Sequence, residues 1–307
     1  MTRILAFGAN GLIGAHTVPL LVARGHEVVT FSRGPQAPDG VLGVERGDIA
    51  DKAAVFAAFE KWRPEAVLQL AATLQFQCEE DPALAVATNL TGAANVYEAA
   101  DRHGAKRFVF ASSIAAYGER RDVMRENDPP AATITLYGEM KRLGERLGRR
   151  FAERAGMSFA ALRYSGVFGP RAASGGSSGR GMSLARHLLM ETATGADADL
   201  DFVDGTETVH LTYVADAAEA TVRALTNPRL AHALYNIGGP ADGYLSLRDF
   251  HAAVKRVVPG AGSARFGAKS GAKSAGPLDT ARMRDDLGWE PRFGVEAGLR
   301  SALGLDA

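Results

Sequence analysis

Residues 1–14 read MTRILAFGANGLIG and give the clearest indication of the fold. A short apolar run ends at Gly8, two further glycines follow at Gly11 and Gly14, and an apolar-rich stretch continues to about residue 24. The order predicts a strand, a tight turn and a helix. Glycine lets the backbone bend and lets a phosphate approach, and the helix N-terminus attracts an anion. The spacing differs from the commoner G-x-G-x-x-G motif, so alone it indicates either a dinucleotide site or an ordinary turn.

The composition gives no electrostatic reason to expect a charged partner. The 307 residues carry 35 basic and 35 acidic side chains, which favours neither nucleic acid nor an anionic membrane. No apolar run is long enough to span a bilayer, and no signal-peptide pattern is present. Cys78 is the single cysteine, either a small apolar filler or a reactive thiol. The lack of a membrane span, a signal peptide and a cysteine pair favours a cytoplasmic protein. The histidines lack metal-ligand spacing, so we expect no metal site.

Strands and helices alternate along the chain as in a doubly wound parallel α/β sheet. Beyond the first unit, strands are predicted at 26–31, 66–72, 106–111, 158–164 and 233–237, with shorter ones near 200–202 and 208–212. Helices are predicted at 51–62, 81–103, 182–194, 214–225 and 247–257, besides one that carries residues 137–141. Loops are predicted at 73–80, 171–181 and 260–276, and the Gly/Ser-rich 171–181 loop is either a lid or a surface insertion.

The end of the second strand carries the residues expected near an adenosine ribose. An acidic residue there would bind the two ribose hydroxyls of NAD, but the chain has Ser32 and Arg33. A guanidinium beside a hydroxyl suits a 2′-phosphate, so the pair favours NADP(H) over NAD(H), unless Arg33 is only a solvated surface side chain. Asp48, at a further strand end, either accepts from an adenine amino group or caps the next helix.

Tyr137 and Lys141 are four residues apart on a predicted helix and therefore share one face. An ammonium beside a phenol lowers the phenol pKa, which would make Tyr137 a general acid or base near neutral pH. Ser113 follows the strand at 106–111, at the edge where such sheets bind ligands, and would hold a substrate oxygen against Tyr137. This trio can move a proton on or off a carbinol oxygen while a nicotinamide cofactor carries the hydride.

In this order the motifs resemble the extended short-chain dehydrogenases/reductases, the group that includes the NAD-dependent epimerases and dehydratases. The matching pieces cover nearly the whole chain: Gly8, Gly11 and Gly14, then Gly47-Asp48-Ile49, Leu70-Ala71-Ala72, Asn89 with Gly92 and Asn95, 108–118, Tyr137 with Lys141, 162–170, 214–218 and 279–291. The resemblance implies a Rossmann-type cofactor domain, at 1–165 and about 213–237. A smaller substrate-binding lobe would comprise about 166–212 and 238–307. A homodimer packed through the helices bearing 89–103 and 137–155 is also implied.

The resemblance implies Ser113, Tyr137 and Lys141 as the catalytic triad. Ser113 is preferred to Ser112 because the family's hydroxyl stands four residues before the tyrosine of a Tyr-Gly pair, here Tyr117. The predicted cofactor contacts are Gly8, Asn10, Gly11, Leu12, Ile13, Gly14, Ser32, Arg33, Asp48, Ile49, Leu70, Ala71, Ala72, Asn89, Tyr137, Lys141, Tyr164 and Val167. The candidate substrate contacts are Thr73, Ser113, Ser165 and His210, although His210 could instead be a histidine without a role in the site.

Departures from the family pattern bear on the substrate. Ile114 and Ala115 stand where sugar-nucleotide dehydratases carry Asp-Glu, so we reject a dehydratase. Ser165 follows Arg163-Tyr164 without the asparagine that epimerases usually show nearby. Val209 occupies the position of the arginine that usually meets the substrate diphosphate, which removes a strong charge-assisted contact. Residues that could replace that arginine are Arg171, Arg180 and Arg282.

We therefore predict an NAD(P)-dependent oxidoreductase that acts on a secondary alcohol or ketone of a polar, sugar-derived small molecule. A UDP-glucose-type sugar-nucleotide 4-epimerase with tightly bound NAD is the alternative within the same family. A cofactor-binding regulator without catalysis is the alternative from another class. A damaged triad would mark such a regulator, whereas here the triad is complete.

Overall fold

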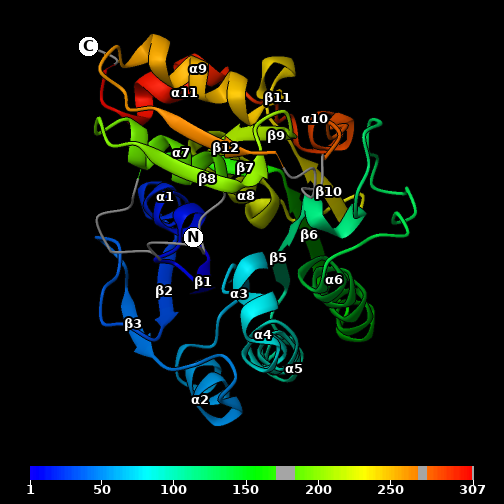
Figure 1. Ribbon diagram of the computed structural model, residues 1–307. Helices are drawn as coiled ribbons and strands as arrows, with labels where there is room; N and C mark the ends of the chain where they lie inside the picture. The colour runs from blue at the N-terminus through cyan, green and yellow to red at the C-terminus, as the bar shows by residue number, and fades with distance from the viewer. Residues whose placement is uncertain (171–183, 269–274, 306–307) are drawn as a thin grey trace.

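A seven-stranded parallel sheet in the order β10-β6-β5-β4-β1-β2-β3 lies at the centre of the computed structural model, which describes residues 1–170, 184–268 and 275–305 (Figure 1). The chain moves outward from β1 to β3 and returns to β4 beside β1, so the strand order reverses there, where open sheets of this kind bind ligands. This confirms the doubly wound, Rossmann-type prediction. The strands are β1 (Arg3–Phe7), β2 (Glu27–Ser32), β3 (Gly43–Arg46), β4 (Ala66–Gln69), β5 (Arg107–Ser113), β6 (Ser158–Tyr164) and β10 (Leu234–Ile237).

Helices cover both faces of this sheet because both faces of its strands are apolar. Successive side chains of β1 alternate between two cores: Ile4 and Ala6 join one cluster, and Leu5 and Phe7 join the other. The first cluster lies under α1 (Leu12–Ala23) and α8 (Val214–Thr226), which pack on each other. The second lies under α2 (Lys52–Trp62), α5 (Ala93–Arg102) and α6 (Leu136–Ala155).

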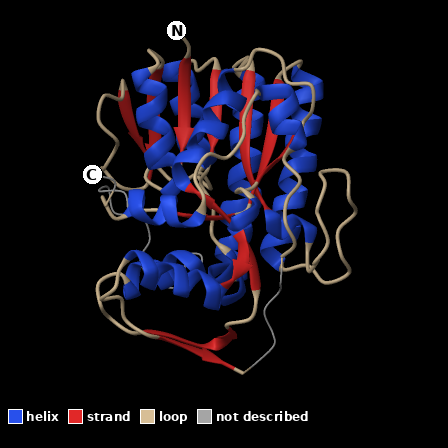
Figure 2. Ribbon diagram, turned by 90° about the horizontal axis from the view of Figure 1, so that it is seen from above, coloured by secondary structure: helices blue, strands red, loops and turns tan. Residues whose placement is uncertain are grey.

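The other described strands form two small sheets beyond the carboxyl ends of the central strands (Figure 2). One sheet has the order β11-β9-β7 and the other pairs β12 with β8. Helices pack around them, and the last turns of the described chain return to this region. The elements are β7 (Gly166–Phe168), α7 (Leu184–Thr192), β8 (Ala198–Asp204), β9 (Thr208–Tyr213), β11 (Tyr244–Ser246), α9 (Leu247–Val257), β12 (Ala264–Gly267), α10 (Ala281–Leu287) and α11 (Val295–Ala302).

Several local predictions were wrong. The segment predicted as a loop at 73–80 contains α3 (Gln75–Glu80), which buries Cys78 against Tyr137 and Met140. The helix predicted at 81–103 is confirmed, although it is divided into α4 (Pro82–Ala85), a π-helical segment η1 (Val86–Gly92) and α5. The strand predicted at 66–72 ends at Gln69, and the 260–276 tract contains β12. The 171–181 loop lies outside the described residues.

Within the described ranges, no helix is long and apolar enough to cross a membrane. The same ranges contain no group of three or more His, Cys, Asp or Glu side chains arranged to hold a metal ion.

Candidate active site

The glycine turn between β1 and α1 has the shape of a phosphate cradle. Gly8 has a φ of +81°, and a Cβ on it would lie 2.6 Å from the Ala71 nitrogen. A Cβ on Gly14 would lie 2.4 Å from the Gly8 oxygen. Gly11 precedes α1 without a side-chain cap, and Leu12 and Ile13 begin the helix. The N-terminus of α1 therefore has no side-chain cap, and its N–H groups are free of competing side chains. Such a helix N-terminus fits the pyrophosphate of a dinucleotide.

The residues predicted near the ribose lie together at the end of β2. The Asn10 amide donates to the Gln36 oxygen at 2.7 Å and to the Ser32 hydroxyl at 3.4 Å. Its own Oδ1 atom is buried and has no hydrogen-bond partner within the described structure, so it is available to a ligand. Arg33 is exposed. Arg46, which the sequence prediction missed, is the register partner of Ser32 on β3 and adds a second guanidinium at this edge.

Asp48 does not cap the following helix. Its Oδ1 accepts from the Ala50 nitrogen at 2.9 Å, whereas Asp51 caps α2 by accepting from the Ala54 nitrogen at 3.1 Å. The Asn95 amide donates to the Ile49 oxygen at 3.0 Å and so fixes the segment that follows β3. The contact of Asp48 with adenine stays a prediction.

Asn89 holds the loop after β4 rather than facing solvent. Its amide accepts from the Thr73 nitrogen at 2.8 Å and donates to the Thr73 oxygen at 2.9 Å. Asn89 lies in η1, and π-helical segments of this kind often occur at functional sites. The preceding residues, Leu70, Ala71 and Ala72, are partly exposed, and Leu70 donates to the Phe7 oxygen at 2.9 Å. The loop is thereby held against the glycine turn.

Ser113, not Ser112, meets Tyr137. Ser113 ends β5, and its Oγ accepts from the Ala115 nitrogen at 3.2 Å at the start of the short helix η2 (Ile114–Tyr117). Its hydroxyl proton is therefore left to donate, and Ser113 is close enough to Tyr137 to lower the pKa of the phenol, although burial has the larger effect. Ser112 is buried and donates to Glu145.

A close helix contact brings Tyr137 to this position. Thr135 begins α6 as its N-cap and accepts from the Gly138 nitrogen at 3.1 Å. A Cβ on Gly138 would lie 2.3 Å from the Ala115 oxygen. Glycine therefore lets the first turn of α6 pack directly on η2, and this packing places the Tyr137 phenol beside Ser113.

Lys141 and Tyr137 are both buried, and burial controls their titration. Lys141 is 4% exposed, its Nζ donates to the Ala111 oxygen at 2.6 Å, and it lies 5.4 Å from the centre of the Tyr137 ring. Burial lowers the pKa of Lys141 to about 8, against the effects of Cys78 and Glu145. Burial raises the pKa of Tyr137 well above its usual value, against the hydrogen bond from Ser113. The expectation of a lowered phenol pKa is therefore wrong for the protein alone, because desolvation of the phenolate dominates.

His210 is not available as a substrate donor. The Leu278 nitrogen donates to its Nδ1 at 2.9 Å, so Nε2 carries the proton and donates to the Gly239 oxygen at 3.0 Å. Burial lowers the pKa of this imidazole, which favours the neutral form that both bonds require. His210 thus joins β9 to two later segments, and the prediction of a substrate contact is corrected.

The remaining predicted contacts from β6 and β7 have side chains occupied by the protein. The Ser165 hydroxyl binds the Thr212 hydroxyl at 2.6 Å, and the Tyr164 hydroxyl binds that of Thr221 at 2.6 Å under α8. Val167 is buried beside Thr212. The Ser165 and Tyr164 hydroxyls are therefore engaged within the protein.

Arg282 is engaged elsewhere and does not replace the arginine absent at Val209. Its guanidinium donates to the Leu234 oxygen at 3.3 Å and lies 3.6 Å from the Glu126 carboxylate. Arg171 and Arg180 lie outside the described residues.

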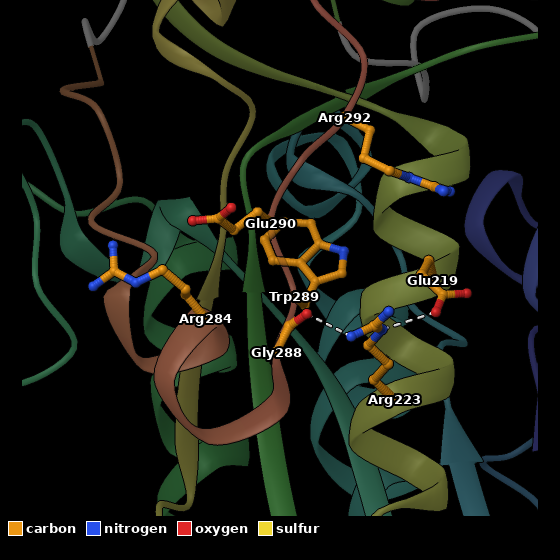
Figure 3. A pocket seen from close by; sticks show the side chains of 7 residues that line it. All are labelled: Glu219, Arg223, Arg284, Gly288, Trp289, Glu290 and Arg292. Carbon is orange, nitrogen blue, oxygen red and sulfur yellow. Dashed lines mark hydrogen bonds and ion pairs between the residues drawn. The ribbon is translucent and has the colours of Figure 1, made fainter.

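A cavity of about 360 Å³ opens at α8 and the segment 284–292, away from these groups (Figure 3). Arg223 crosses it, donating to Glu219 at 2.8 Å and to the Gly288 oxygen at 2.5 Å. Glu219 also pairs with Arg24, which follows the last turn of α1, so this cavity lies at the end of α1 opposite the glycine turn. Through Arg223, α8 is hydrogen-bonded to the segment at 284–292. The lining residues are Glu219, Arg223, Arg284, Gly288, Trp289, Glu290 and Arg292.

Known proteins match this chain over most of its length. The model of the NAD dependent epimerase/dehydratase family matches residues 4–238. A UDP-glucose 4-epimerase of Lacticaseibacillus casei is 29% identical over 94% of this chain and 92% of its own. The structure of a Thermus thermophilus UDP-glucose 4-epimerase in complex with NAD has a TM-score of 0.85 at 28% identity, covering 98% of both chains. A GalE-like L-threonine dehydrogenase from Cupriavidus necator, in its holo form, has the same TM-score at 26% identity, covering 99% of both chains.

The burial of Lys141 predicts a specific pH dependence of stability. Its pKa is about 8 in the folded protein and 10.5 when unperturbed, so the unfolded chain binds the proton more tightly and folding is opposed at lower pH. This penalty fades as the pH rises from about 8 to about 10.5. We expect the free energy of unfolding of the wild type to rise relative to Lys141→Met by about 2 kcal/mol between about pH 7 and about pH 10. Urea unfolding at both pH values measures it.

Exposed Lys255 provides the matched control. The difference between wild type and Lys255→Met should not change with pH. If the free energies of unfolding of wild type and Lys141→Met changed with pH in parallel, the prediction that burial opposes the charge on Lys141 would be wrong.

Proposed function

Because the chain belongs to the NAD dependent epimerase/dehydratase family, we propose that it is an NAD(P)-dependent oxidoreductase. Its reaction would interconvert a secondary alcohol and a ketone on a polar, sugar-derived small molecule. The observation that carries the proposal is the meeting of Ser113, Tyr137 and Lys141 at the carboxyl end of β5. The nicotinamide, when bound, supplies the hydride acceptor or donor. The glycine turn fits its pyrophosphate, and the smaller lobe at about 166–212 and 238–307 would cover the substrate.

The three side chains divide the proton chemistry. As phenolate, Tyr137 would take the proton from a carbinol oxygen; as phenol, it would give a proton to a carbonyl oxygen in the reverse direction. When substrate is bound, the Ser113 hydroxyl, whose oxygen is anchored by the Ala115 N–H, would turn from Tyr137 to donate to the same substrate oxygen and keep it beside Tyr137. Lys141 uses one N–H on the Ala111 oxygen and has others for a ribose hydroxyl. Its charge favours phenolate when the proton leaves.

The choice between net oxidation and epimerisation depends on the substrate side. The structural match is equally close to an epimerase and to an L-threonine dehydrogenase, so the fold does not discriminate. Valine at position 209 and the engagement of Arg282 with Glu126 weaken the case for a diphosphate-bearing substrate. We therefore favour net oxidoreduction. Relatives named UDP-glucose 4-epimerases, among them that of Lacticaseibacillus casei, favour a sugar-nucleotide 4-epimerase as the second candidate.

The two candidates predict different products from the purified enzyme. Net oxidoreduction predicts accumulation of reduced nicotinamide with a polar secondary alcohol, for which L-threonine and sugar alcohols are suitable probes, and no turnover of UDP-glucose. Conversion of UDP-glucose to its 4-epimer without added cofactor would overturn net oxidoreduction in favour of epimerisation.

Tyr137→Phe tests the catalytic part of the proposal in either reaction. We expect kcat to fall by at least about 100-fold while the Kd for NAD(H), measured by fluorescence titration, stays nearly constant. Tyr97→Phe is the matched control because Tyr97 is also a buried tyrosine, and its hydroxyl donates to the Gly144 oxygen outside the trio. If Tyr137→Phe retained wild-type kcat, the proposed acid/base role would be wrong.

We propose NADP(H) as the preferred cofactor. Relatives support nicotinamide cofactors in general, and the Thermus enzyme was solved with NAD. The preference rests on exposed Arg33 beside the Ser32 hydroxyl, with Arg46 as the register neighbour of Ser32. Two guanidiniums near one hydroxyl suit a 2′-phosphate better than two ribose hydroxyls.

Arg33→Ala tests the cofactor preference. We expect the Kd for NADP(H) to rise about tenfold, from the loss of one charge-assisted contact, and the Kd for NAD(H) to change little. The control is Arg300→Ala, which removes an exposed arginine on α11. Tighter binding of NAD(H) than NADP(H) by the wild type, together with indifference to Arg33→Ala, would reject the preference.

We also propose a homodimer formed through α5 and α6 with the segment before α5. Tyr97 of α5 donates to the Gly144 oxygen of α6 at 3.1 Å, so the two helices present one continuous face. Leu143 on α6 is 48% exposed and Leu84 on α4 is 42% exposed, and the proposed interface would bury both side chains.

Leu143→Glu should convert the dimer into a monomer in sedimentation velocity, because a carboxylate would be buried in the interface. The control is Leu42→Glu, since Leu42 is equally exposed but precedes β3. A monomeric wild type, or a dimeric Leu143→Glu protein, would contradict the proposed interface.

A further inference from the structure

A buried ion pair lies directly behind the catalytic residues. Glu145 follows Lys141 by four residues on α6 and shares its helix face. Its carboxylate accepts from the Arg163 guanidinium at 2.8 Å and 2.7 Å and also from the Ser112 hydroxyl. The side chains of Arg163 and Glu145 are 3% and 10% exposed. Three donors thus converge on one carboxylate in a space almost closed to water.

This carboxylate connects α6 to the strand end that carries Ser113. Ser112 and Arg163 are register partners on β5 and β6, so Glu145 binds both strands at the same level. One turn earlier on α6, Lys141 donates to the oxygen of Ala111, the residue before Ser112. Consecutive turns of the helix therefore bind consecutive residues of the strand. These two bonds fix how far Ser113 stands from Tyr137.

Arg163 is itself held from the opposite side. Its guanidinium lies 4.3 Å from the centre of the Tyr117 ring and donates to the Glu126 oxygen at 3.4 Å. The Tyr117 hydroxyl donates to the Asn236 side chain at 2.7 Å. Because Arg163 cannot move away without breaking these contacts, the Glu145 carboxylate has a fixed position.

We propose that Glu145 is a positioning residue for the proposed reaction: through Ser112 it fixes the end of β5 against α6, and it places a negative charge behind the Lys141 ammonium. Only the part that Lys141 plays in turnover rests on the proposed function. The tie to β5 and the charge belong to the protein alone.

The charge distinguishes this role from simple stabilisation. A buried ion pair can often be replaced by apolar side chains without loss of stability. The titratable groups that act on Lys141 are Cys78 from α3 and Glu145 from α6, and the Tyr137 phenol lies beside it. On the strand side it meets the Ala111 carbonyl and the Phe110 ring. Cys78 and, after it, Glu145 oppose the effect of burial on the pKa of Lys141. Burial raises the pKa of the Cys78 thiol, so Glu145 is the carboxylate whose charge can be removed to test this effect.

The direct test is the titration of Lys141 by NMR of protein labelled with ¹³C at lysine Cε. Lys141→Arg identifies the signal by its loss. Glu145→Gln keeps the shape of the side chain and removes its charge, so we expect the Lys141 midpoint to fall by at least about half a pH unit. Glu145→Asp, which keeps the charge, should restore most of the shift. Glu139→Gln, which removes an exposed carboxylate from the same helix, should leave the midpoint unchanged.

An unchanged midpoint in Glu145→Gln would overturn the proposal. If that variant does not fold, Ser112→Ala decides, because it keeps both charges and deletes the bond to β5. A tenfold or larger fall in kcat with an unchanged Kd for NAD(H) supports the positioning role, and wild-type kcat overturns it. Failure of the proposed function is separate: the NMR midpoint would still shift in a protein that turns over none of the substrates tested.

Discussion

The Arg163–Glu145 ion pair is the contact on which the geometry of the candidate site depends. It joins β6 to α6 and, through Ser112, includes the end of β5. Removing one partner of a buried pair costs about 3–5 kcal/mol because an uncompensated charge is left behind. The free energy of unfolding of native domains is only about 5–15 kcal/mol, so the loss of either partner would remove a large share of it. The same constraint that keeps the sheet and helix together holds Ser113 beside Tyr137.

Burial has opposite consequences for the two titrating members of the trio. It lowers the pKa of the Lys141 ammonium and raises that of the Tyr137 phenol, so both groups favour their neutral forms. Because Lys141 and Tyr137 are shielded from water, each charged group near them has a large effect on their pKa values. Glu145 favours the charged form of Lys141, and Ser113 favours the charged form of Tyr137. A site built in this way is ready for proton transfer but holds the proton on the phenol until a substrate arrives.

The sequence predicted those parts that depend on local pattern. The apolar run before Gly8 and the alternation of strands and helices were sufficient for the doubly wound sheet, and the spacing of Tyr137 and Lys141 placed them on one helix face. Features that depend on tertiary burial were missed. Cys78 lies in a helix because it packs on Tyr137, and β12 forms because β8 supplies its partner. The phenol pKa was predicted wrongly because the sequence shows a neighbouring charge but not the loss of solvent.

Strand register was the second feature that the sequence did not reveal, because pairing between distant strands leaves no local sequence pattern. It brings Arg163 beside Ser112 and Arg46 beside Ser32, and it turns His210 toward backbone groups. We propose that a fixed frame of α6 and β5 presents Ser113, Tyr137 and Lys141 to a dinucleotide bound at the glycine turn. A crystal structure of the protein with NADP(H) tests this arrangement most directly. We expect the pyrophosphate to lie over Gly11 and the Lys141 Nζ to lie within hydrogen-bond distance of the nicotinamide ribose. A dinucleotide bound elsewhere, or a ribose out of reach of Lys141, would contradict it.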